Sequence, residues 1–176
     1  MTSKTPQYVI EPLDPKKHDR KAFICEESAL NEYIYKQANR ESKANTSKCF
    51  ILISKDAPIT IRGFYTLSST SISLCRLPSN ISRKLPNRDK VPATLLGRIA
   101  RHIEFKDERI GPHLMYSALR RAFISSKEIA SAGIVLDAKN EVLANYYESY
   151  GFLRLQDTPD SIRMFLPMKD LATRFQ

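Results

Sequence analysis

The sequence predicts an α+β domain in which strands and helices mix without strict alternation. Short β-rich runs and amphipathic helical runs follow one another along the chain, with no internal repeat and no low-complexity stretch. A length of 176 residues suits one domain, and 42% apolar residues are enough to build a packed core. We therefore expect one domain over residues 1–176.

The first half of the chain predicts four strands and one helix. Strand composition is found at Tyr8–Leu13, Cys49–Ile53, Ile59–Leu67 and Ser71–Leu77. Between the first two of these runs, Phe23–Asn39 carries apolar residues at the spacing of one helical face. A turn at Lys55–Pro58 connects the second and third runs, so the three later strands should form an antiparallel meander.

The second half begins with Pro78–Pro92, where prolines and basic residues stand without apolar periodicity, which predicts an exposed cationic loop. Leu95–Phe105 then predicts a strand. Pro112–Ser125 predicts a helix, because proline is tolerated in the first helical turn. The remaining predicted elements are a buried strand at Gly133–Ala138, a helix at Glu141–Tyr150 ended by a left-handed cap at Gly151, and strands at Phe152–Leu155 and Ile162–Pro167.

Composition narrows the classes of partner. The chain carries 28 Lys or Arg against 19 Asp or Glu, a formal net charge of +9, which attracts nucleic acids, nucleotide cofactors or acidic proteins. No apolar run approaches the ~20 residues that span a bilayer, and Met1–Gln7 has no signal-peptide stretch, so we expect a cytoplasmic protein without a membrane partner. Cys25, Cys49 and Cys75 form no CxxC pair, which predicts buried thiols and no metal site.

Two segments have the composition of a functional site. The loop Lys106–Gly111 leads into a predicted helix, whose free N–H groups form an anion site suited to a pyrophosphate. Many strand-to-helix connections have this appearance, so the loop alone is a weak signal. Further on, Leu143, Tyr147 and Gly151 lie one turn apart along the predicted helix Glu141–Tyr150 and its cap, which aims Tyr147 along one face. Ordinary amphipathic packing of the tyrosines is the alternative.

These two segments, in this order, resemble the GNAT superfamily of acetyl-coenzyme A dependent N-acetyltransferases. The resemblance extends over nearly the whole chain to the GNAT toxins of bacterial type II toxin–antitoxin systems. The matching blocks are Phe23–Cys25, Leu30–Tyr33, Gln37–Ala38, Ile61–Leu67, Leu85–Pro86, Val91–Pro92, Leu95–Ala100, Val135–Ala138 and Tyr146–Phe152. The resemblance implies a GNAT fold, with a mixed, mostly antiparallel twisted sheet flanked by helices.

The resemblance also implies the site residues. Tyr147 occupies the position of the catalytic tyrosine, and a phenol with a pKa of about 10 can protonate a departing thiolate. The α-amine needs no dedicated base, because its pKa is only about 8. The acetyl-coenzyme A residues implied are Ile99, Ala100 and Arg101, through their backbone, together with Lys106, Arg109, Ile110, Gly111, His113 and Asn140.

The chain departs from the superfamily pattern in the phosphate loop. Arg109 stands where a glycine is usual, and it either adds a charged contact to the phosphates or occupies their place. Arg101 and His102 stand where the toxins usually have Val-Asp. His102 is either a base beside the thioester or a partly exposed strand residue, and His113 is either a phosphate contact or a solvated residue.

The basic residues indicate the second substrate. Between Arg76 and Arg109 there are nine Lys or Arg and four Asp or Glu, a net +5 in about a fifth of the chain. Toxins of this family acetylate the amino acid carried on tRNA, and we assign tRNA contacts to Arg83, Lys84, Arg88, Lys90 and Arg98.

The implied partners are aminoacyl-tRNA, a second copy in a homodimer, a ribbon-helix-helix antitoxin, and operator DNA through that antitoxin only. Two other functions stay open at this point. One is acetylation of a protein lysine, a polyamine or a small amine, and the other is an RNA- or protein-binding module that has lost acetyl transfer.

Overall fold

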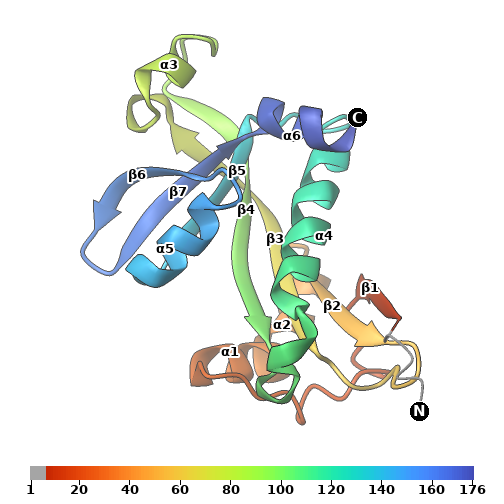
Figure 1. Cartoon of the computed structure of the whole chain (residues 1–176). Coiled ribbons are helices and arrows are strands. Elements are labelled where there is room, and N and C mark those ends of the chain that lie inside the picture. Colours follow the sequence, from red (N-terminus) through yellow and green to blue (C-terminus); the bar gives the residue numbers. More distant parts are fainter. Residues whose placement is uncertain (1–6) are drawn as a thin grey trace. The chain divides into compact units, whose positions relative to one another are not determined.

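The computed structural model describes residues 7–176, apart from the side chains of 156–158. The strands of this part are β1 (Tyr8–Pro12), β2 (Lys48–Ser54), β3 (Gly63–Ser73), β4 (Lys90–Arg101), β5 (Gly133–Ala138), β6 (Leu153–Thr158) and β7 (Ser161–Pro167). Its helices are α1 (Ser28–Glu32), α2 (Ala38–Lys43), α3 (Ser79–Ser82), α4 (Ile110–Ser125), α5 (Glu141–Glu148) and α6 (Met168–Phe175) (Figure 1).

The strands form one sheet in the order β1-β2-β3-β4-β5-β7-β6. Strand β4 pairs with β5 in parallel, whereas β1–β2, β2–β3, β5–β7 and β6–β7 pair antiparallel. The predicted α+β class with a mixed, mostly antiparallel sheet is confirmed. The chain divides into two compact units: unit 1 comprises residues 7–68 and 98–118, and unit 2 comprises 69–97 and 119–176. The prediction of a single domain over residues 1–176 stays a prediction.

In unit 1, alternate residues of the strands face two different helical layers. Ile51 and Phe64 are register partners, and both belong to a buried cluster with Tyr33 and Ile34 of the first helical segment. The neighbouring residues point the other way, where the Tyr65 hydroxyl lies 2.8 Å from Ser117 Oγ of α4. The strands of this unit therefore pack against the α1–α2 segment on one face and against α4 on the other.

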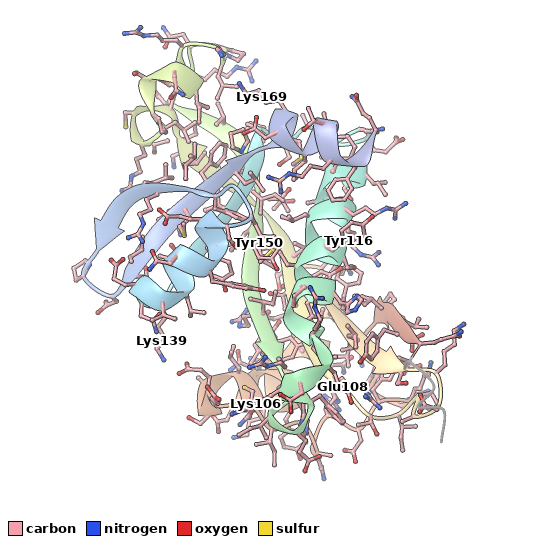
Figure 2. All side chains as sticks on the ribbon, in the orientation of Figure 1. Lys106, Glu108, Tyr116, Lys139, Tyr150 and Lys169 are labelled. Carbon is pink, nitrogen blue, oxygen red and sulfur yellow. The ribbon has the colours of Figure 1, made fainter. Side chains whose placement is uncertain are left out.

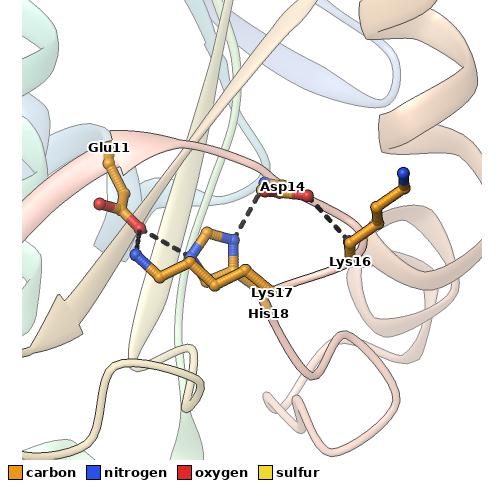
Figure 3. A network of polar contacts seen from close by, with 5 residues as sticks. All are labelled: Glu11, Asp14, Lys16, Lys17 and His18. Atoms are coloured by element: carbon orange, nitrogen blue, oxygen red, sulfur yellow. Dashed lines mark hydrogen bonds and ion pairs between the residues drawn. The ribbon is translucent and has the colours of Figure 1, made fainter.

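A buried histidine fixes the segment that follows β1. The His18 side chain is fully buried, its Nδ1 accepts a bond from the backbone N–H of Asp14, and its Nε2 lies 2.8 Å from Glu11 Oε1 (Figure 3). Lys17 binds the same carboxylate oxygen, which lowers the pKa of Glu11. The turn is thus held by polar contacts to its own neighbours, and these account for both ring nitrogens.

Unit 2 has its own core around β4, β5 and β7. Val91, Val135 and Phe165 are buried together, and Phe123 of α4 packs on Phe175 of α6 with ring centroids 5.9 Å apart. Gly151 ends α5 with φ of +97°, the left-handed conformation that glycine adopts without steric cost. The left-handed cap predicted from the sequence is therefore confirmed.

Two strands differ most from their predicted bounds. Ile59–Leu67 and Ser71–Leu77 were expected as separate strands, but one strand, β3, contains the end of the first and the start of the second, while Leu74–Arg76 form a 3-10 turn where a strand was predicted. Strand β4 runs from Lys90 to Arg101, whereas the predicted strand was Leu95–Phe105. Its first residues therefore lie inside the predicted Pro78–Pro92 loop. Pro92 has no N–H to donate to the ladder, but its carbonyl accepts the N–H of Ala132 at 2.8 Å.

The helical elements differ in three places. The first helix is shifted from Phe23–Asn39 to residues 28–43, and its centre is a π-helical stretch, Tyr33–Gln37. The short helix α3 lies in the cationic loop, and α6 follows Pro167; neither was predicted. Helix α6 exists because it buries Met168 and Leu171 against unit 2, a tertiary contact that overrides its polar composition.

The cysteines differ from one another. Cys25 and Cys49 are buried as predicted, and burial raises the pKa of the Cys49 thiol to about 12. Cys75 is exposed, so the prediction of a buried thiol is wrong there, because the residue lies in a short 3-10 turn at the end of β3. Among residues 7–176 no helix is long and apolar enough to cross a bilayer. Of the segment Met1–Gln7, on which the signal-peptide prediction was made, the structure describes only Gln7.

Candidate functional site

The loop between β4 and α4 has the geometry of an anion site. A 3-10 turn over Ile103–Glu108 follows β4, Arg109 then adopts φ of +53°, and α4 begins at Ile110. The first N–H groups of a helix have no partner within the helix, and here Ile110, Gly111 and His113 supply them, since Pro112 has none. Arg109 keeps the left-handed backbone that glycine would favour, so the path of the loop survives the missing glycine.

An ion pair beneath this loop was missed by the sequence reasoning. Arg62 of unit 1 is 9% exposed, and its Nη1 binds the Glu108 carboxylate, which also accepts a 2.9 Å bond from the Tyr8 hydroxyl. The Arg62 guanidinium lies 4.3 Å from the centroid of the Phe105 ring. Burial, followed by the bond to Glu108, raises the pKa of Tyr8. The available signal was an arginine inside the apolar run Ile61–Leu67.

Contacts to the rest of unit 1 fix the other side of the loop. Arg101 donates from Nη1 to the Lys106 carbonyl at 3.2 Å, and Lys106 Nζ lies 2.8 Å from Glu26 Oε1, a bond that lowers the pKa of Glu26. Figure 2 labels Lys106 and Glu108 on the turn that precedes α4. The side chains of Arg101 and Lys106 therefore already have protein partners that shape the loop.

His102 is a structural cap. It is 6% exposed, its Nδ1 accepts the backbone N–H of Glu104 at 3.2 Å, and its Nε2 lies 3.1 Å from the Ala22 carbonyl oxygen. Because a carbonyl can only accept, Nε2 donates in this bond. Both nitrogens are used inside unit 1, which disfavours the role of a base. His113 is exposed on α4, with its ring centroid 5.1 Å from that of Tyr8.

A close approach of strand and helix sets where α4 begins. A Cβ added to Gly63 would lie 2.8 Å from both Ile110 Cγ2 and Leu114 Cδ1, and 3.0 Å from the Ala100 carbonyl oxygen. Ile110 itself is completely buried. The glycine therefore lets the first turn of α4 sit directly on the strands, which places its free N–H groups.

Strand β4 changes character along its length. Its ladder with β5 consists of Thr94–Ile134 and Leu95–Val135, and within unit 2 it does not continue to Leu96 or Gly97 among the described residues. Burial alternates at Val91 and Ala93 but resumes one residue out of phase at Leu96, as at a β-bulge. The residues assigned to the pantetheine arm, Ile99, Ala100 and Arg101, follow this point on the same strand.

The predicted catalytic tyrosine lies in unit 2. Tyr147 is on α5, is 6% exposed, and packs against Phe152 with ring centroids 6.1 Å apart. Burial raises the pKa of its phenol, which stabilises the protonated form. Asn140 is the N-cap of the same helix, where its Oδ1 accepts the Leu143 N–H at 2.9 Å. Its carboxamide oxygen is thus used within the helix.

The predicted tRNA residues fall into two groups. Arg83, Lys84, Arg88 and Lys90 are exposed in unit 2, as expected for a cationic surface. Arg98 belongs to unit 1, where its guanidinium lies 3.7 Å from the centroid of the Tyr33 ring and 3.7 Å from Glu41 Oε2. Its charge is therefore partly balanced inside unit 1, whereas the other four have no ion pair with any residue that the structure describes. The described residues include no group of three or more His, Cys, Asp or Glu placed to hold a metal ion.

Comparison with known proteins identifies relatives along nearly the whole chain, although no protein-family model matches it. The "Probable toxin TacT" of Sinorhizobium fredii is 34% identical over 172 residues, which are 94% of this chain and 93% of that protein. The "tRNA-acetylating toxin" of Mycobacterium tuberculosis is 28% identical over 152 residues, 86% of this chain and 87% of the relative.

Solved structures agree with these relatives. AtaT in complex with acetyl-methionyl-tRNAfMet is 25% identical, covers 97% of this chain and 100% of its own, and superposes with a TM-score of 0.87. AtaTR bound with acetyl-coenzyme A is 26% identical, covers 96% and 98%, and has a TM-score of 0.82. The chain therefore belongs to the GNAT-superfamily acetyltransferase toxins of type II toxin–antitoxin systems.

Proposed function

We propose that this protein acetylates the α-amino group of aminoacyl-tRNA with acetyl-coenzyme A and thereby blocks translation. The observation that carries the proposal is the 34% identity over 172 residues to a toxin of this family, together with a relative named as a tRNA-acetylating toxin. An acetylated α-amine has become an amide, so it can no longer attack the peptidyl ester during peptide-bond formation.

The residues of unit 1 fit acetyl-coenzyme A. The free N–H groups of Ile110, Gly111 and His113 point out of the first turn of α4 and suit a pyrophosphate. Arg109 is exposed beside them, and it has no ion pair with a described residue, so its guanidinium is available to the phosphates. The backbone of Ile99–Arg101, the last residues of β4, would hold the pantetheine arm by strand-like hydrogen bonds.

Bound acetyl-coenzyme A supplies the acetyl thioester. In the reaction the amine nitrogen bonds to the acetyl carbon, the carbon–sulfur bond breaks, and the nitrogen loses a proton to solvent, from which the Tyr147 phenolate later regains one. Tyr147 donates its phenolic proton to the departing thiolate, and burial helps by keeping the phenol protonated at neutral pH. Lys106 and Asn140 act on the cofactor indirectly in this scheme, since they hold the loop and the start of α5.

The partners follow from the same relationship. The exposed basic residues Arg83, Lys84, Arg88 and Lys90 take the tRNA, with Arg98 contributing less. A ribbon-helix-helix antitoxin neutralises the toxin and carries the complex to operator DNA. A relative 26% identical to this chain has been solved as a KacTA–DNA complex. We place the protein in the cytoplasm, as a homodimer.

The direct test is acetylation of charged tRNA. Purified protein is incubated with a full set of aminoacyl-tRNAs and labelled acetyl-coenzyme A, and the aminoacyl end is released and analysed. Label should appear as N-acetylated amino acid for at least one tRNA. Absence of label with every amino acid, from protein that binds coenzyme A, would exclude the function.

A further inference from the structure

The cationic segment of unit 2 contains a pocket. It measures about 670 Å³ and opens between the end of β3, the helix α3 and the residues leading into β4. A backbone hydrogen bond of 3.0 Å from the Leu74 N–H to the Asp89 carbonyl oxygen connects the two segments that border the pocket. Figure 1 shows α3 in the connection between the ends of β3 and β4. The sequence predicted only a loop here.

The lining combines two arginines, apolar surface and a carboxamide with two serines and one acidic residue, Asp89, so its net charge is +1. Arg83 and Arg88 both line the pocket, both are exposed, and neither is ion-paired within the part of the chain that the structure describes. Leu74 and Leu85 contribute apolar surface and are half-buried against the core of unit 2. Asn87 adds a carboxamide that can both donate and accept hydrogen bonds.

These contacts match the parts of a nucleotide. Arginine binds phosphate oxygens through its planar fork, apolar surface accepts the face of a base, and a carboxamide reads a base edge. A volume of about 670 Å³ lies within the range of small-ligand sites, roughly 300–1,000 Å³. Double-helical RNA presents phosphates on its outside and keeps its bases stacked, so a flat basic surface would serve it equally well.

We infer that this pocket binds one unpaired nucleotide of the tRNA substrate. The inference rests on the proposed function and deepens it, because Arg83 and Arg88 form a nucleotide pocket rather than part of a uniform charged surface. Lys84 and Lys90 lie in the same segment but do not line the pocket, and they add only general attraction to phosphates.

Cys75 provides a readout that is independent of activity. It lines the pocket and is exposed, whereas Cys25 and Cys49 are buried and burial raises the pKa of both thiols. Alkylation of the folded protein should therefore modify Cys75 first. With deacylated tRNA at about ten times its Kd, roughly a tenth of the protein stays free, so alkylation of Cys75 should slow about tenfold. A single-stranded oligoribonucleotide should protect it at a concentration where a duplex of equal length does not.

Two charge-matched double variants provide the control. Arg83→Gln with Arg88→Gln and Lys84→Gln with Lys90→Gln each remove two positive charges, so they lose the same general attraction. The arginine double variant should raise the Kd for tRNA about tenfold more than the lysine double variant, because only the arginines lose charge-assisted hydrogen bonds to the bound nucleotide. Equal increases in Kd for the two double variants, or equal protection of Cys75 by duplex and single-stranded RNA, would overturn the inference.

The outcomes separate this inference from the function. If the protein acetylates aminoacyl-tRNA but bound tRNA does not slow the alkylation of Cys75, the nucleotide pocket is refuted and the proposed function is not. Protein that binds no tRNA refutes both. If Cys75 is unreactive in the free, folded protein, another copy of the chain covers the pocket, and the inference is also overturned.

Discussion

Replacement of Glu108 by Gln tests whether the buried ion pair positions the phosphate loop. The variant keeps the size of the side chain and removes its charge. Arg62 would then remain at 9% exposure with no carboxylate partner, and its Nε already lacks a hydrogen-bond partner among the described residues. The expected result is a less stable protein with a displaced loop.

The magnitude follows from burial. Exposed ion pairs contribute about 0–1 kcal/mol, whereas removal of one partner from a fully buried pair costs about 3–5 kcal/mol. The two side chains here are 10% and 31% exposed, between those limits, so we expect a loss of about 2 kcal/mol. For a chain of this length, that corresponds to a fall in Tm of roughly 4–8 °C.

The assay is thermal unfolding with and without coenzyme A, together with calorimetric binding of coenzyme A. Glu104→Gln is the matched control, because Glu104 lies in the same turn, is exposed, and has no ion pair with a described residue. A double variant, Arg62→Met with Glu108→Gln, should recover part of the stability, since it removes the unpaired buried charge. A Tm within about 1 °C of the Glu104→Gln control would refute the reasoning.

Three further predictions concern single residues. Gly63→Ala should cost roughly 1–3 kcal/mol in unfolding free energy, because the new Cβ meets Ile110 and Leu114 at 2.8 Å; chemical denaturation measures this, and an unchanged midpoint would contradict the close approach. Arg109→Gly should keep the fold, since glycine suits φ of +53°, and should weaken coenzyme A binding about tenfold by calorimetry if the guanidinium contacts the phosphates; tighter binding would mean that the side chain occupies their place. Tyr147→Phe should lower kcat at least about 100-fold with the melting curve retained. In the wild type, burial raises the pKa of this acid above its ordinary 10.0, so its protonated form persists as pH rises; the rate should increase as an amine of pKa about 8 is deprotonated and should not decline below about pH 10. A decline centred below pH 9 would argue against Tyr147 as the proton donor.

Elements with strong local signals were predicted well. The strand Gly133–Ala138 has its predicted bounds, and Gly151 ends α5 in the left-handed conformation that its position indicated. Helix α4 begins two residues before the predicted Pro112. These elements depend on apolar runs and end signals within a few residues of one another, which a single sequence contains.

Elements that depend on distant partners were predicted poorly. The long strand β3 contains serines and a threonine that favour turns when considered alone. Helix α6 has a polar composition, and its apolar side is recognised only where Phe175 meets Phe123, 52 positions earlier in the chain. A contact over such a separation leaves no local pattern, because either partner alone is compatible with another environment.

The sequence by itself determined the family, the α+β class, and the positions of Tyr147 and of the loop before α4, because each of these is encoded in short ordered blocks. Tertiary structure alone decided what the charged residues do. Arg62 joins Glu108 across 46 positions, His102 is committed as a cap, and Arg98 lies over Tyr33, while Arg83 and Arg88 line a pocket. The physical reason is that a charge has the same formal value in every sequence context, whereas its burial and its partners are set only when distant segments come together.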